Sequence, residues 1–181
     1  MKTETVFWLL VTVAALVSMG VLIGDSDGNG DEGEDELFST ADERHAIADV
    51  CIGGHGDEND PLVRHDHATI SVSVNGELVT IPNGVGLDDN GCSMRALHTH
   101  DSQGKIHIEF KEEGVEAPIE AFFDIWGKHM DSTGFDEHRI DANHEFLMFV
   151  TQNGERVEVD SFENHILENG QTIELVFREK A

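Results

Sequence analysis

The stretch ATISVSVNGELVTI, residues 68–81, decides the fold expected for this chain of 181 residues. Its first half alternates isoleucine and valine with threonine and serine, which is the period-2 pattern of a strand with one buried face. The Asn75-Gly76 pair that follows is the strongest short-range signal for a two-residue hairpin turn. We therefore predict a β-hairpin in which residues 68–74 pair with residues 77–81.

Apolar runs bounded by turn residues predict five more strands. Two of them form a second hairpin around residues 101–104, and an Asn-Gly pair joins two others. The predicted strands are residues 94–100, 105–110, 144–151, 156–159 and 172–177.

One helix is predicted between these strands, opened by Pro118 and ended by Gly127. Its apolar residues recur at i, i+3, i+4 and i+7, the spacing of one helix face, and they are Ile119, Phe122, Phe123 and Trp126. This stripe is typical of a helix that packs against a core, and we attach no cofactor role to Trp126.

Several strands with one helix on a face predict an α+β domain. A first hairpin, a crossing helix and a last strand entered through a turn are similar to the β-grasp plan. The expected fold is therefore a small β-grasp-like sheet with one packed helix, behind one N-terminal transmembrane helix. A β-sandwich is the alternative.

Histidine is the unusual residue of the composition, because the 11 histidines equal in number the 11 lysines and arginines. Two H-x-H pairs occur, and a further histidine follows the second pair. Residues two apart in a strand share a face and lie about 7 Å apart, so their imidazoles can converge on one ion. The predicted metal ligands are His65, His67, His98, His100, His107 and Glu109.

The register of the second hairpin supports this prediction. With a turn at residues 101–104, His98 faces His107 and Leu97 faces Ile108. A loop two residues longer on one side pairs His100 with His107 instead. Both registers place the histidines opposite the apolar residues, whereas a slip by one position mixes the two faces. We therefore expect the histidines on a sheet face away from the core, or at its rim, and solvated surface histidines are the alternative.

The ligand types favour copper, with zinc as the alternative. Imidazole binds both metals, and the affinity order places copper above zinc. Cys92 and Met94 lie upstream of His98 and offer a soft sulfur ligand for Cu(I), although Met94 is more typical of a core residue.

An apolar run without charge, VFWLLVTVAALVSMGVLI, covers residues 6–23 and nearly spans a hydrocarbon core of roughly 30 Å. Lys2 precedes the run and thirteen acidic residues follow it between residues 25 and 60, so the positive-inside rule places the N-terminus in the cytoplasm. We predict that residues 1–24 form a single-pass anchor in the cell membrane, with a cleaved signal peptide as the alternative. Either reading makes the remainder extracytoplasmic.

Residues 25–60 form an acidic segment that we predict to be a flexible stalk, and residues 61–181 form the His-rich domain. The alternative for the stalk is an EF-hand-like calcium loop, whose ligand positions match Asp25, Asp27, Asn29, Asp31 and Glu36. The formal net charge of −26 for the whole chain disfavours nucleic acids and anionic lipid headgroups as partners, because both are negatively charged.

The chain has two cysteines, Cys51 and Cys92. In an oxidising compartment a disulfide between them is the expected state. It would join the stalk segment to the domain.

Three motifs together resemble an uncharacterised family of exported proteins of archaea and bacteria. They are RHDHATISVSVNG from Arg64, LHTHDSQGKIHIE from Leu97 and FFDIWG from Phe122, in this order behind an N-terminal membrane segment. The resemblance implies an anchored extracytoplasmic domain in which the six predicted metal ligands occupy motif positions. It implies no activity.

Three functions are compatible with these patterns. The first is membrane-anchored metal handling, in which the histidines are ligands and no reaction is required. The second is a metalloenzyme with an open position on a three-histidine site. The third is a protein-interaction module whose histidines sense pH. The sequence contains no motif that names a reaction, so a non-catalytic role is preferred, and neither a catalytic residue nor a protein partner is identified.

Overall fold

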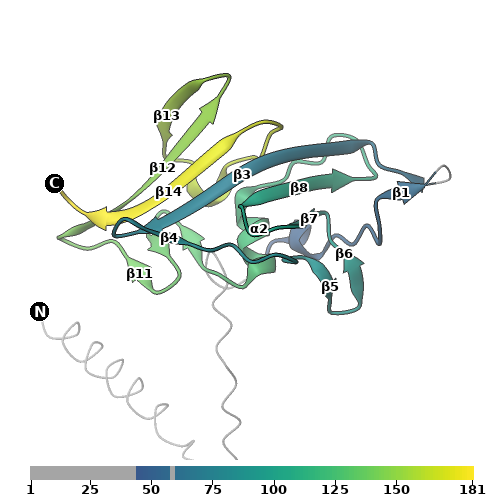
Figure 1. The fold of residues 1–181 in the computed structure, drawn as a ribbon, viewed down its shortest axis with the longest axis horizontal. Coiled ribbons are helices and arrows are strands. Elements are labelled where there is room, and N and C mark those ends of the chain that lie inside the picture. Colours follow the sequence, from purple (N-terminus) through teal and green to yellow (C-terminus); the bar gives the residue numbers. More distant parts are fainter. Residues whose placement is uncertain (1–43, 58–59) are drawn as a thin grey trace, which may run out of the picture. The chain divides into compact units, whose positions relative to one another are not determined.

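The computed structural model of the protein describes residues 44–57 and 60–181 (Figure 1). The predicted membrane anchor, the candidate calcium loop and the first part of the predicted stalk lie outside the described residues. Within the described residues, no helix is both long enough and apolar enough to cross a bilayer.

The domain is an α+β structure built on one open, seven-stranded sheet. Along the sheet the order is β13 (Glu155–Val159), β12 (His144–Gln152), β14 (Thr172–Glu179), β3 (Arg64–Val74), β8 (Lys105–Phe110) and β7 (Leu97–His98). β4 (Glu77–Val79) pairs with the second half of β3, whose first half pairs with β8. The two long central strands, β3 and β14, run parallel, and the other strand pairs of this sheet are antiparallel.

Shorter elements surround this sheet. They are η1 (Ala46–Asp49), β1 (Gly56–Asp57), β2 (Asp60–Pro61), β5 (Leu87–Asp89), β6 (Cys92–Met94), β9 (Met130–Asp131), β10 (Gly134–Phe135), β11 (His138–Arg139) and η2 (Phe162–Asn164). β9, β10 and β11 form a small sheet of their own in a region where the sequence predicts no strand.

The first hairpin is confirmed. β3 and β4 pair around Asn75 and Gly76, which adopt φ values of 51° and 85°. A positive φ at both central residues is what a type I′ turn requires, and asparagine and glycine accept it most easily. Alternate β3 residues are buried, beginning with Ala68 and Ile70, so the predicted core face is confirmed as well.

The strand predicted at residues 94–100 is wrong in one respect, because the chain divides it between two sheets. β6 pairs with β5, whereas β7 pairs with β8. Between them, the buried Arg95 donates to the Asp89 carboxylate and to the Ala48 carbonyl. Because these contacts hold Arg95 in place, the strand is interrupted there, and the chain joins the main sheet only at β7.

The predicted helix is confirmed as α2 (Ile119–Trp126), with Pro118 and Gly127 as its caps. Gly127 adopts the left-handed conformation, with φ at 72°, that commonly ends helices. Phe122 and Phe123 are fully buried in the core and Trp126 packs against it, so the aromatic stripe faces the core as expected.

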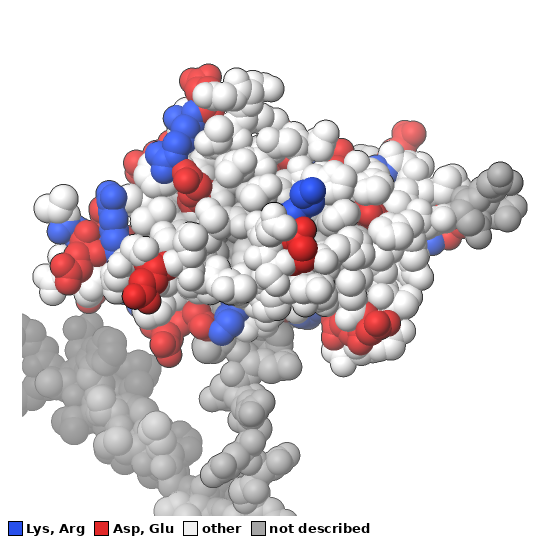
Figure 2. Space-filling model, in the orientation of Figure 1, with Lys and Arg blue, Asp and Glu red and all other residues white. Residues whose placement is uncertain are grey.

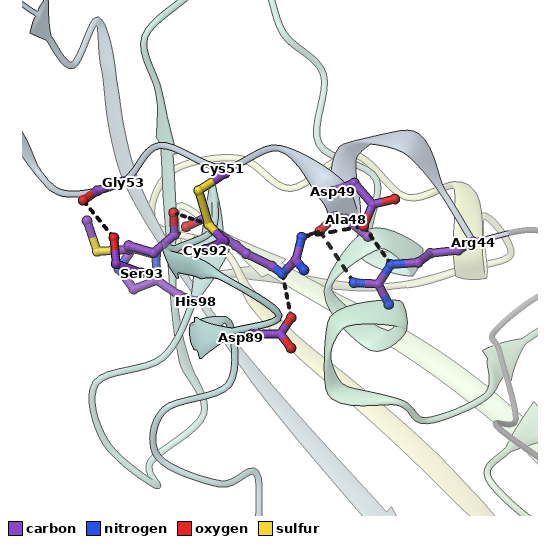
Figure 3. Close-up of a disulfide and its surroundings, with 11 residues drawn as sticks. Arg44, Ala48, Asp49, Cys51, Gly53, Asp89, Cys92, Ser93 and His98 are labelled. Carbon is purple, nitrogen blue, oxygen red and sulfur yellow. Dashed lines mark hydrogen bonds and ion pairs between the residues drawn. A yellow bond between two sulfur atoms is a disulfide. The ribbon is translucent and has the colours of Figure 1, made fainter. Parts of the chain in front are cut away.

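The described part of the predicted stalk packs on the domain. Ala48 and Ile52 are buried in the main hydrophobic core, and Cys51 forms a disulfide with Cys92, the pairing expected from the sequence. Figure 3 shows this disulfide beside the hydrogen bond from Ser93 Oγ to the Gly53 carbonyl. The compact unit therefore includes residues before 61, within the segment 25–60 that is predicted to be a flexible stalk.

Charge is dispersed over the domain. Residues 61–181 carry 9 lysines and arginines against 23 aspartates and glutamates. Figure 2 shows acidic side chains scattered over the face in view instead of gathered in one patch. No single acidic surface on this face suggests a docking site.

Candidate metal centre

Three neighbouring strands carry five of the six predicted ligands, and His100 lies two residues after the end of β7. On β3, His65 lies across from Glu109 and His67 across from His107, both on β8. On the other side of β8, His98 of β7 lies across from His107. The structure thus adopts the first of the two predicted registers, with Leu97 opposite Ile108 and the apolar residues on the core side.

The histidines form two groups of three whose ligand atoms lie within 4.8 Å of one another. The first group, which we call the inner triad, is His98, His100 and His107. The second, the outer triad, is His65, His67 and His107. His107 belongs to both, and ring centroids within the inner triad are 4.7–5.0 Å apart.

The cluster contains a sixth histidine, which the sequence pattern does not predict as a ligand. His55 precedes β1, and its Nδ1 lies 3.2 Å from Glu109 Oε2. Its ring centroid lies 5.6 Å from that of His100. His55 is a lone histidine in a glycine-rich acidic segment, so no local pattern marks it. Only its position four residues after Cys51 connects it to the domain.

Glu109 lies beneath the imidazoles and is fully buried. Besides His55, its carboxylate contacts His65, with Nε2 and Oε1 3.1 Å apart, and His107, with Nδ1 and Oε1 3.5 Å apart. Glu109 Oε1 and His107 Nδ1 are both buried, and these ion-pair contacts do not have the geometry of full hydrogen bonds. A buried polar atom that is left fully unpaired costs roughly 1–3 kcal/mol. Such atoms are what a metal ion or its ligands would satisfy.

His98 is held in one orientation. Its Nδ1 lies 2.9 Å from the Arg95 carbonyl oxygen, to which it donates. Its Nε2 lies 3.1 Å from His100 Nε2. Because the Nδ1 proton is used on the carbonyl, Nε2 of the neutral ring keeps a lone pair directed at His100. A backbone carbonyl that fixes the tautomer in this way is characteristic of metal-binding histidines.

The site is more buried than a solvated sheet face. His98 and Glu109 are inaccessible to solvent, whereas His65 and His100 are exposed. The expectation of an open face is therefore correct only for the outer rim. Burial has an electrostatic consequence, because desolvation lowers the pKa of His98 to about 4 and also lowers the pKa of His67 and of His107. These rings are neutral at pH 7, which is the ligating form of imidazole.

The pKa of His98 predicts that the metal-free protein loses stability in acid. In the unfolded chain His98 binds a proton below about 6.5, whereas in the folded chain it does so only near 4. Stability should therefore fall as the pH drops from 6.5 to 4, by up to about 3 kcal/mol from this residue. Urea unfolding at pH 7 and pH 4.5 measures the loss, and His98→Asn should reduce it. If His98→Asn and the wild type lose equal stability, the assignment is wrong.

A glycine packs against the back of His98. A Cβ on Gly86 would lie 2.5 Å from the Leu97 carbonyl oxygen and 3.1 Å from His98 Cβ, and Gly86 has a φ of +76°. Gly84 has a similar φ of +84° but open space around it. Alanine at position 84 therefore measures the cost of the backbone conformation alone.

We expect Gly86→Ala to lower stability by more than Gly84→Ala, by about 1–3 kcal/mol, because the β7 backbone must move. Thermal unfolding of both variants without metal gives the difference. Equal melting temperatures would show that this loop does not constrain β7.

Two sulfur candidates are not ligands. Cys92 is bonded to Cys51, and Met94 is buried in the hydrophobic core. The ligand set in the described residues is therefore imidazole and carboxylate only. The other histidines lie elsewhere; His144, for example, stacks on Phe177 and contacts Asp141.

Comparisons of the chain with protein-family models, with curated proteins and with solved structures found no match.

Proposed function

We propose that this chain is a membrane-anchored, extracytoplasmic metal-binding protein whose histidine cluster binds copper for metal handling, with zinc as the alternative ion. The observation that carries the proposal is the cluster of six imidazoles near the edge of the sheet, three of which contact the buried Glu109 carboxylate. Three of these histidines contact the buried Glu109 carboxylate, and the ion-pair contacts of its Oε1 do not have the geometry of full hydrogen bonds, which supports a further cation at this position.

The donor atoms support copper or zinc over other ions. Magnesium and calcium prefer oxygen ligands, whereas imidazole nitrogen suits zinc, copper, iron and nickel. Because both cysteines are used in the disulfide, the cluster lacks the thiolate that favours Cu(I). The affinity order for divalent ions then puts Cu(II) first.

A metalloenzyme is the second candidate, favoured by one observation. A hollow of about 380 Å³ beside the cluster is lined by His55, Asp60 and Lys111 together with the glycines near His55. A three-histidine site with an exposed side leaves a position for water or substrate, and Glu109 is the nearest base. Binding of azide to the loaded protein, seen as a change in the copper absorption spectrum, would favour this candidate.

The membrane part of the proposal rests on residues 6–23 and on the charge asymmetry around them. The strand order supports the β-grasp plan as the finer description of the fold. The parallel pair of β3 and β14 is central, β3 pairs with its hairpin partner β4, β14 pairs with β12, and α2 precedes β12.

Metal analysis of the full-length chain tests the proposed function. The chain is purified without a histidine tag, loaded with Cu(II) or Zn(II), and dialysed against a chelator that removes weakly held ions. We expect retained metal in the wild type and in His138→Gln, which lies outside the cluster. A wild-type protein that retains no ion would overturn the proposal and leave the protein-interaction module as the better explanation.

A further inference from the structure

The candidate ligands lie on both sides of one strand. β8 runs between β3 and β7 (Figure 1), so His107 has His67 on one side and His98 on the other. The His107 ring centroid is 4.5 Å from that of His67 and 5.0 Å from that of His98. Within the described residues, no ring contact joins the β3 histidines to His98 or His100. The two triads thus share one member, His107, while the ring of His55 lies 5.6–6.4 Å from those of His65, His98 and His100.

The number of donors exceeds what one ion uses. Zinc takes four ligands, and catalytic zinc sites take three protein ligands plus water. Six imidazoles and one carboxylate converge here, and each triad by itself meets the three-ligand requirement. A single ion bound by one triad would leave the other two histidines of the second triad without a metal.

His107 has the chemistry to serve both triads. An imidazole has two ring nitrogens, and each can bind one ion once the ring has lost its remaining N–H proton. Nδ1 of His107 is buried, and its polar neighbour is Glu109 Oε1 at 3.5 Å. We propose that the cluster is a two-ion centre, with one ion in the inner triad, one in the outer triad and the His107 ring shared between them. This inference rests on the proposed function.

Two features reduce the repulsion between two cations at this separation. Glu109 places a carboxylate against both His65 and His107, at the junction of the triads. The domain around them carries 14 more acidic than basic side chains over residues 61–181, which makes the local potential favourable for cations. When His107 bridges, its ring proton leaves to solvent, so loading of the second ion should release a proton.

Copper stoichiometry tests the inference on the full-length chain in mild detergent, with Cu(II) alone as the probe and a competing chelator present. We expect two ions per wild-type chain. Retention of one ion would overturn the two-ion centre while the proposed function stands, whereas retention of none overturns both. His138→Gln/His144→Gln is the matched control and should still hold two, because neither residue belongs to the cluster.

Two variants assign the ions to the triads. His65→Gln/His67→Gln removes the outer pair, which is accessible enough for the substitutions to be tolerated, and it should hold one ion. His100→Gln leaves the inner triad with two imidazoles and should also hold one. Retention of two ions by either variant would place an ion outside the triads and overturn the inference.

Electron paramagnetic resonance detects magnetic coupling between two ions, a signal that loss of structure would not produce. Two Cu(II) ions flanking one imidazole couple magnetically, so the fully loaded wild type should show a broadened or weakened signal. His65→Gln/His67→Gln should show the sharp signal of one isolated ion. An isolated-ion signal from a wild type that holds two ions would also contradict a shared His107.

Discussion

Replacing His107 with glutamine is expected to weaken copper binding more than any other single change. Among the described residues it is the only histidine that belongs to both triads, and its ring contacts His65 and His67 of one and His98 and His100 of the other. Loss of a partner that merely orients a ligand costs metal affinity about 10- to 100-fold, so loss of a direct ligand should cost more than about 100-fold. Competition titration with a chelator of known affinity measures the change.

His144→Gln is the matched control for this variant. His144 also lies in a strand and is half-buried, but its ring packs on Phe177, away from the cluster. Its affinity for copper should equal that of the wild type. Circular dichroism of the metal-free proteins establishes that both variants are folded. A folded His107→Gln protein that binds copper as tightly as the wild type would mean that the site lies elsewhere.

Loss of the disulfide is expected to produce the largest change in stability. Cys51 and Cys92 are separated by 41 residues, and closing a loop of this length removes enough entropy from the unfolded chain to contribute about 4 kcal/mol. Cys51→Ser/Cys92→Ser should therefore unfold at a urea concentration lower by about 2 M, given the usual slope for a small domain.

In the metal site, the same variant should disturb only the position of His55, which lies at the rim of the cluster. The disulfide and the hydrogen bonds from the Ile52 and Gly53 amides to the Met94 carbonyl hold the segment that positions His55. Neither triad contains His55, so copper should still bind. Reduced wild-type protein is the control, since it lacks the bond without any substitution and should unfold with the variant. Equal unfolding of oxidised and reduced wild type would contradict the stabilising role.

The sequence predicts those parts of the site that follow the period of a strand. His65 and His67 alternate with the buried residues of β3, and His107 alternates with Ile106 and Ile108. A single register, fixed by the hydrophobic pattern, then brings His98 across from His107. The first hairpin and α2 were predictable for a similar local reason, because turn and cap residues mark their ends.

What the sequence did not predict depends on contacts between distant residues. His55 reaches Glu109 because a disulfide and backbone hydrogen bonds fix its segment, and neither leaves a local pattern. The division of the strand at residues 94–100 depends on the contacts of Arg95 with Ala48, which is distant in sequence, and with Asp89, which lies on the other side of the β5–β6 turn. β9 to β11 have two residues each, too few to display a period.

X-ray absorption at the copper edge of the loaded, full-length chain tests the central claim most directly. If the histidine cluster binds the ion, the nearest shell contains nitrogen at about 2 Å, with the outer-ring scattering of three or more imidazoles. The His107→Gln protein, loaded in the same way, should lose part of that imidazole scattering. A shell made of oxygen alone, or one that contains sulfur, would contradict the assignment of the metal site to these histidines.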